Sequence, residues 1–152
     1  MPVALRIVVI AAAVVAFLVI SFFVARWLTA DNRERSYVTE LLTYQSKGDS
    51  GSMLDLMPAC SASAACRART RALARRFAGG GDVKIVRYDS ATTQALSSET
   101  GPTRVAWLDG GPDSPIWVQC IEVTRSGLAF LGGKVTLDSI SKPIGGEGTC
   151  PA

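Results

Sequence analysis

Two different hydrophobic patterns divide the chain. From Ile7 to Ala25, nineteen consecutive residues carry no charge, and Ser21 is the only polar side chain among them. At about 1.5 Å per helical residue this segment spans roughly 30 Å, the thickness of a bilayer's hydrocarbon core. No polar stripe interrupts the segment, as one would in a surface helix of a soluble protein. The pattern predicts a single transmembrane anchor within residues 1–28.

A cleaved signal peptide is the alternative interpretation, because Arg6 followed by an apolar run also fits such a peptide. The run is longer than the 7–15 apolar residues or so that are typical of signal peptides. The nearest small-residue site, Leu28-Thr29-Ala30, is a poor cleavage signal. We therefore expect the anchor to be retained, with Arg26 at its end and Trp27 at the level of the lipid headgroups.

Helical spacing continues beyond the anchor. Tyr37, Leu41 and Tyr44 recur at i, i+4 and i+7, which predicts that residues 29–48 form a juxtamembrane first helix of the soluble domain. The membrane helix can run into it without a break. Capping and turn residues then predict two further helices, the first with Ser50 as its cap, over residues 50–57 and 66–78.

Beyond Gly81 the hydrophobic period changes from helical to alternating, and β-forming residues become frequent. A bulge is expected at Gly132-Gly133. Helices followed by a bent antiparallel sheet make an α+β fold, with the rest of the domain over residues 49–144 and a tail over residues 145–152. The expected strands are residues 83–88, 92–96, 103–109, 116–125 and 128–143.

Four cysteines, Cys60, Cys66, Cys120 and Cys150, all lie in the soluble part. An even number fits two disulfides in an oxidising compartment, and of the three possible connectivities we expect Cys60–Cys66 and Cys120–Cys150. The first would staple a short loop, and the second would tie the tail to a strand. A zinc site is disfavoured because no Cys-x2-Cys pair and no histidine is present, so we expect no metal and no cofactor.

Two signals conflict over the side of the membrane on which the domain lies. Arg26, Arg33 and Arg35 follow the anchor and only Arg6 precedes it, which by the positive-inside rule places the domain in the cytoplasm. The cysteines indicate the opposite side. We give the cysteines more weight and expect a single-pass protein of the cell membrane with an extracytoplasmic C-terminal domain.

The most conspicuous charged feature is a set of five arginines without an acidic residue among them. Arg67, Arg71 and Arg75 share one face of the predicted third helix, and we take them as candidate binding residues for phosphate, carboxylates or anionic headgroups. Arg69 and Arg76 lie nearly opposite, with Leu73 and Phe77 in between. A solvated helix surface is the simpler explanation of the same pattern.

Two tryptophans are the other candidates for a ligand site. Trp107 and Trp117 flank one predicted hairpin, where they would either line the mouth of a pocket or belong to the core. Beyond Arg6 and Arg26, the domain holds 14 basic and 13 acidic residues, so its charge gives no reason to expect nucleic acid as a partner.

The chain also resembles a known family. The phrases Trp107-Leu108-Asp109-Gly110-Gly111, Trp117-Val118-Gln119-Cys120 and Ser141-Lys142-Pro143-Ile144, with the ending Gly148-Thr149-Cys150-Pro151, look like those of membrane-anchored nuclear transport factor 2-like proteins of high-GC Gram-positive bacteria. The resemblance covers roughly the whole chain and implies a cystatin-like cone, in which a bent sheet wraps a long helix. It implies a fold more than an activity.

Three classes of function follow. We favour a non-enzymatic accessory domain of the cell envelope that binds a partner protein or small ligand. A pocket enzyme of isomerase or hydrolase type would need a general base, for which Asp89, Asp109 and Glu122 are the candidates, although each fits a turn or a solvent-facing position. A single-pass subunit of a membrane complex is the third class, with small residues on the anchor as its helix contact: Ala11, Ala12, Ala13 and Ala16.

Thiol labelling of intact cells tests the expected location. All four cysteines should resist a membrane-impermeant maleimide until a reductant is added, and should then become labelled from outside. Four free thiols that are labelled only after the cells are permeabilised would instead place the domain in the cytosol.

Overall fold

The chain folds into helices followed by an antiparallel sheet, as the pattern predicts. The computed structural model describes residues 3–90, 98–111, 113–127, 133–146 and 148–150. Its elements are α1 (Val3–Lys47), α2 (Ser50–Leu56), α3 (Pro58–Ala62), α4 (Ala64–Phe77), β1 (Val83–Asp89), β2 (Glu99–Asp109), β3 (Ile116–Ser126) and β4 (Lys134–Ile140). The predicted strand at residues 92–96 and the first residues of the predicted last strand lie outside the described residues.

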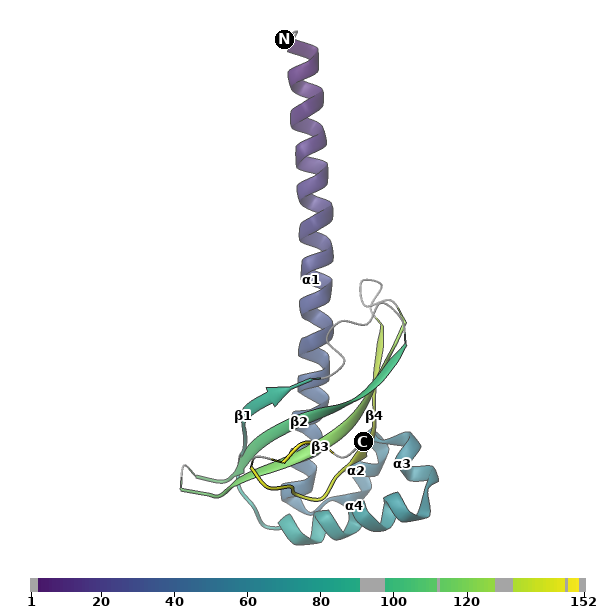
Figure 1. Ribbon diagram of the computed structural model, residues 1–152, viewed down its shortest axis with the longest axis vertical. Coiled ribbons are helices and arrows are strands. Elements are labelled where there is room, and N and C mark those ends of the chain that lie inside the picture. Colours follow the sequence, from purple (N-terminus) through teal and green to yellow (C-terminus); the bar gives the residue numbers. More distant parts are fainter. Residues whose placement is uncertain (1–2, 91–97, 112, 128–132, 147, 151–152) are drawn as a thin grey trace.

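Helix α1 is continuous over 45 residues and has two different environments. Its first part, Leu5–Ala25, has a mean hydropathy of 3.2, contacts no other part of the fold closely enough to be buried, and is long and apolar enough to cross a membrane. This part projects from the rest of the molecule (Figure 1). The expectation that the membrane helix runs into the first helix of the domain is confirmed.

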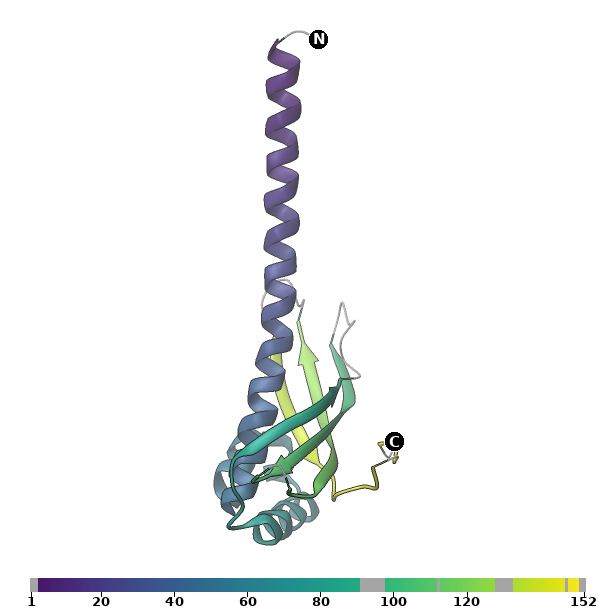
Figure 2. The same cartoon turned by 90° about the vertical axis from the view of Figure 1, so that its left-hand side faces the viewer.

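The second part of α1 lies across the sheet and supplies much of the core. Val38, Leu41 and Leu42 are fully buried there. Figure 2 shows α1 on one side of the curved sheet and the C-terminal tail on the other. The face of α1 that meets the sheet is apolar because residues three and four apart fall on one side of a helix.

The strands of the described residues pair in the order β1-β2-β3-β4, each antiparallel to its neighbour. Trp107 of β2 and Trp117 of β3 are direct register partners, so both face α1 and α4. The register shifts between Ile85 and Arg87 and again between Glu122 and Val123, which adds local twist. The bulge that the sequence predicts at Gly132-Gly133 involves a residue outside the described part.

The helical connections differ from expectation in two details. The side chain of Asp49, not Ser50, caps α2, because its carboxylate accepts a hydrogen bond from the Ser52 amide at 3.1 Å. The segment before Cys66, expected as a loop, contains α3 with Pro58 in its first turn, and α4 begins at Ala64. Proline at a helix start is favourable, so Pro58 begins one short helix as well as ending another.

Both expected disulfides are present. Cys60 is bonded to Cys66 across α3 and α4, and Cys120 is bonded to Cys150. The second bond ties the tail to β3, beside which the backbone of Ile144 also pairs with that of Val118. The Arg104 guanidinium donates to the carbonyl of Gly148 at 3.1 Å and fixes the same segment.

A polar network lies inside the apolar core. Gln45 of α1 and Gln119 of β3 are both fully buried and donate to each other's side-chain oxygens at 3.0 and 3.4 Å. The indole N–H of Trp107 donates to the same Gln119 oxygen at 2.9 Å, and the Gln119 amide donates to the Ser141 carbonyl at 3.0 Å. This network fixes α1 against the sheet in one register, because a shifted helix would leave buried polar groups unpaired.

Substitution of Gln119 tests this account. Gln119→Ala removes the partner of both the Trp107 indole and Gln45, and each buried group left unpaired costs about 1–3 kcal/mol. We expect the free energy of unfolding in urea to fall by about 3 kcal/mol. Glu122→Ala, at a half-buried position of the same strand, should change it by less than about 0.5 kcal/mol. Equal effects of the two substitutions would contradict a stabilising network.

Candidate functional site

The arginines of α4 lie around its exposed side. Thr70, Leu73, Ala74 and Phe77 form the buried face of this helix. The guanidinium of Arg67 is half-buried and donates to the Ser61 carbonyl at 2.6 Å. The exposed members are Arg69, Arg71, Arg75 and Arg76.

Arg71 and Arg75 are one helical turn apart on the same exposed side, next to Arg67. We call Arg67, Arg71 and Arg75 the arginine face. The three arginines therefore lie on one side of α4, as helical spacing predicts. The buried apolar residues of α4 separate them from the two remaining arginines. Among the residues that the structure describes, no ion pair includes Arg71 or Arg75.

Arg76 packs against aromatic side chains of the core and does not belong to the arginine face. Its guanidinium carbon lies 5.4 Å from the ring centre of Trp117 and 5.7 Å from that of Phe77. A guanidinium over an aromatic ring at this distance is favourable and also shields the half-buried Trp117 from water. Arg76 is therefore better explained as a cover for the hydrophobic core.

The arginine face is remote from the anchor. Helix α4 lies at the end of the domain farthest from the N-terminus (Figure 1). The 22 residues from Ala25 to Lys47 rise about 33 Å along α1. Charges interact weakly beyond a Debye length of about 8–10 Å. If Leu5–Ala25 spans a membrane, these arginines lie too far from its headgroups to bind them, which removes one of the options from the sequence.

The tryptophan pair belongs to the core. Trp107 is fully buried, and Phe77 packs against both tryptophans with ring centres 5.2 Å apart in each case. Trp117 is half-buried beneath Arg76. The structure thus places the two rings as a packing layer between α4 and the sheet, with Trp107 inaccessible to a ligand.

A cluster that the sequence analysis missed surrounds Glu34, which is 0% exposed. The hydroxyl of Tyr88 donates to Glu34 Oε1 at 2.5 Å, and the hydroxyl of Thr103 donates to the same oxygen at 2.8 Å. Arg125 donates through Nε to Oε2 at 2.6 Å and makes an ion pair to the same oxygen through a terminal nitrogen. The four residues connect α1 to three different strands.

The position of Glu34 in the sequence did contain a usable signal. Glu34 precedes Val38, Leu41 and Gln45 at helical spacing, so it lies on the buried face of α1. Arg125 lies two residues after the buried Val123 on the same strand, so both side chains point to the same side of the sheet. A charge in line with a buried stripe needs an opposite charge, and this requirement could have suggested the pair.

The surroundings of Glu34 keep it charged. Burial by itself raises the pKa of this carboxyl, but the hydrogen bonds from Tyr88 and Thr103 and the positive charge of Arg125 outweigh burial and lower the pKa below the ordinary value of 4.5. A carboxylate with a lowered pKa and occupied oxygens is a poor proton acceptor for a substrate. The cluster is therefore a structural lock.

The three acids considered for catalysis are not brought together. Asp89 is exposed and paired with Arg87 at 2.8 Å, whereas Asp109 lies at the opposite end of the β1–β2 ladder. Glu122 lies on β3, where its register partner is Ser139 of β4. No two of them share a site.

Asp109 has an unusual environment. Burial raises its pKa, and a hydrogen bond from the Gly81 backbone offsets this only in part. Its carboxylate lies so close to Gly80 that a Cβ there would come within 2.0 Å of Oδ1. The observed packing therefore needs glycine at position 80, which gives the triple glycine a structural reason.

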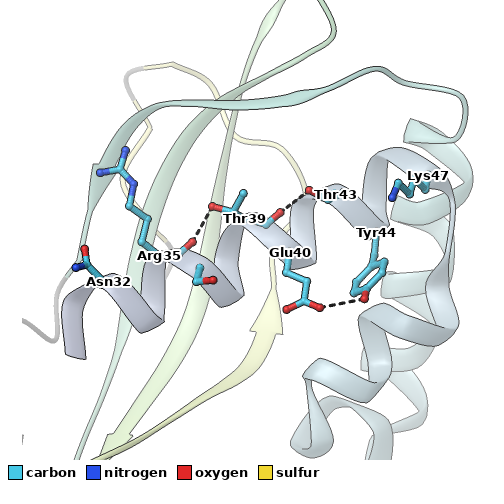
Figure 3. Close-up of a pocket in the computed structure, with 8 residues that line it drawn as sticks. Asn32, Arg35, Thr39, Glu40, Thr43, Tyr44 and Lys47 are labelled. Carbon is cyan, nitrogen blue, oxygen red and sulfur yellow. Dashed lines mark hydrogen bonds between the residues drawn. The ribbon is translucent and has the colours of Figure 1, made fainter. Parts of the chain in front are cut away.

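Depressions on the surface of the described residues include two that border α1. The larger, of about 560 Å³, follows one side of α1 and is shown in Figure 3. Tyr44 donates to Glu40 within it at 3.0 Å. A smaller one of about 120 Å³ lies where α1 and α2 meet β4, between Tyr37 and Leu56. The larger is lined by Asn32, Arg35, Ser36, Thr39, Glu40, Thr43, Tyr44 and Lys47.

The lock predicts a specific dependence of stability on pH. Because the pKa of Glu34 is lowered on folding, its contribution is complete above pH 4.5 and is lost as the pH falls through the lowered value. Arg125→Ala should cost about 3–5 kcal/mol at pH 7, where it leaves a buried charge unpaired, and less at pH 3, where Glu34 can take up a proton. Urea denaturation between pH 3 and 7 measures both effects. Glu40→Gln, on the exposed side of α1, is the matched control, and a loss in Arg125→Ala that is the same at every pH would contradict the lock.

Similarity to known proteins does not assign this chain to a family. Comparison of the chain with models of protein families, with curated proteins and with solved structures finds no match. Among the described residues, no three histidine, cysteine, aspartate or glutamate side chains are grouped so as to hold a metal ion.

Proposed function

We propose that this chain is a membrane-tethered accessory domain of the cell envelope, which binds an acidic partner protein through the arginine face and catalyses no reaction. The observation that carries the proposal is the position of Arg71 and Arg75. Both are exposed, lie one turn apart on α4 and are at the end of the domain farthest from the anchor. Planar guanidinium groups suit carboxylates, to which they can donate two parallel hydrogen bonds.

An extracytoplasmic location supports this role. One helix is long and apolar enough to span a membrane, and all four cysteines are paired in disulfides, which persist in oxidising compartments. A domain held on such a helix presents its far end to the compartment and not to the lipid. The arginine face would then meet soluble or membrane-bound proteins some 30 Å from the bilayer surface.

A binding role fits the interior of the domain better than catalysis. In the cone of nuclear transport factor 2-like proteins, which the chain resembles, a ligand would enter the concave side of the sheet. Here the buried side chains of α1 fill that side, with Leu41 and Gln45 fully buried. A buried acid beside a tyrosine, Glu34 with Tyr88, is the combination that a pocket isomerase or hydrolase would use, but Arg125 holds this acid in its charged form.

Crosslinking in membranes tests the arginine face. The tagged full chain would be crosslinked in its native membranes and purified beside a variant with Arg71→Glu and Arg75→Glu. We expect the recovery of specific neighbours to fall about tenfold in the variant, because each reversal replaces an attractive charge pair by a repulsive one. Quantitative mass spectrometry of the recovered proteins is the measurement.

The control has the same change in net charge. Lys84→Glu with Lys134→Glu alters two exposed lysines on β1 and β4, away from α4. This variant should recover the same neighbours as the unmodified chain. If the arginine variant recovers them equally well, the arginine face is an ordinary solvated surface and the proposed partner site is wrong.

A further inference from the structure

The exposed side of α1 below the anchor has its own regular pattern. Asn32, Ser36, Thr39 and Thr43 recur at intervals of four, three and four residues. This is the spacing of the positions through which two helices pack in a coiled coil. We call these four residues the seam. Because Val38 and Gln45 mark the buried side, the seam lies on nearly the opposite side of the helix.

The seam is shaped for close approach of another helix. Its side chains are small and polar, and they line the depression of about 560 Å³ along α1 (Figure 3). The Thr39 hydroxyl donates to the Arg35 carbonyl at 2.7 Å, and the Thr43 hydroxyl donates to the Thr39 carbonyl at 2.8 Å. Because these two hydroxyls already have partners within α1, covering them leaves neither of the two donors unsatisfied.

We propose that a second copy of this chain occupies the seam, so that two α1 helices pair in parallel. Identical chains enter the bilayer with the same orientation, and their anchors therefore bring the two seams together side by side. A twofold axis parallel to the helices makes such a contact self-complementary. The inference rests on α1 being retained as an anchor, as in the proposed function, and does not depend on what the arginine face binds.

Charge complementarity fixes the register. In the seven-residue repeat of a coiled coil, Ser36 and Thr43 take one of the two contact positions, and Asn32 and Thr39 take the other. Arg35 and Glu40 then flank the seam on its two sides. In a parallel pair, a flanking residue faces the residue five positions later on the other helix. Arg35 of one copy then meets Glu40 of the second copy, and symmetry forms this pair twice. Both side chains are exposed, and Arg35 extends over the Tyr88 ring at 5.8 Å.

The same spacing continues through the membrane segment. Counting back from Asn32 in alternating steps of three and four reaches first Thr29 and then five apolar residues: Ala25, Phe22, Leu18, Val15 and Ala11. Apolar and small side chains on one face allow close packing of helices in lipid. All five lie in the part of α1 that the rest of the fold leaves exposed, so the same helical spacing is available in the apolar segment.

Within the part of the chain that the structure describes, the depression along the seam is lined by residues of α1 alone. The sheet packs on the side of α1 that carries Val38 and Gln45, and the tail lies beyond the sheet (Figure 2). Two copies joined through their seams would therefore place their sheets on the outside. The arginine faces would then lie on one assembly, as a pair at the far end from the membrane.

Cysteine crosslinking of the full chain in liposomes tests the pairing. Ser36→Cys places a thiol in the seam, and the matched control, Tyr37→Cys, places one at the next residue, about 100° around the helix. The native cysteines are all paired, so the added thiol is the only free one. Mild oxidation bridges only cysteines whose Cα atoms come within about 7 Å. We expect the covalent dimer of Ser36→Cys to exceed that of Tyr37→Cys at least fivefold.

Charge exchange in the Ser36→Cys background tests the register. Arg35→Glu alone and Glu40→Arg alone should each lower the crosslinked fraction about threefold, and the two together should restore it. Equal crosslinking at positions 36 and 37 would overturn the pairing, and so would a Ser36→Cys dimer that ignores the charge exchange. The Arg71→Glu and Arg75→Glu substitutions should leave the dimer unchanged, which separates failure of this inference from failure of the proposed partner site.

Discussion

The architecture depends on α1, one unbroken helix with an apolar first part and an amphipathic second part. Residues Leu5–Ala25 of α1 have the length and apolar surface that lipid requires, and the residues after them turn one apolar side to the sheet and a polar side to water. Val38, Leu41 and Leu42 are fully buried in the core. The apolar segment and the core are therefore joined by one continuous helix and not by a flexible linker.

Buried polar contacts determine how the sheet sits on this helix. Apolar packing alone tolerates small shifts of a helix along a sheet, whereas a buried charge does not. Glu34 with Arg125 fixes the membrane-proximal end of the contact, and Gln45 with Gln119 fixes the distal end. Since two polar anchor points lie three helical turns apart on α1, they define both its register and its direction across the strands.

Local features of the fold were predictable from the sequence, and long-range polar contacts were not. The membrane segment, the helical spacing of Tyr37 and Leu41, the alternating strands and the arginines of α4 all follow from residues near one another in the chain. The disulfide pairing that we expected is present, but the sequence alone left three connectivities open. The Glu34–Arg125 pair joins residues 91 positions apart, and only the folded sheet brings them together. Helix α3 was missed because Pro58 signals both the end and the start of a helix.

The unbroken backbone between bilayer and core has a mechanical consequence. With about 33 Å of straight helix between Ala25 and Lys47, the domain behaves as a rigid lever on its anchor. Transmembrane helices tilt by about 20° on average and adjust that tilt to bilayer thickness. A change of about 10° in tilt would displace the base of the domain sideways by roughly 6 Å, about one helical turn. If Leu5–Ala25 spans a membrane, the thickness of the surrounding lipid would therefore affect the position of the far end of the molecule.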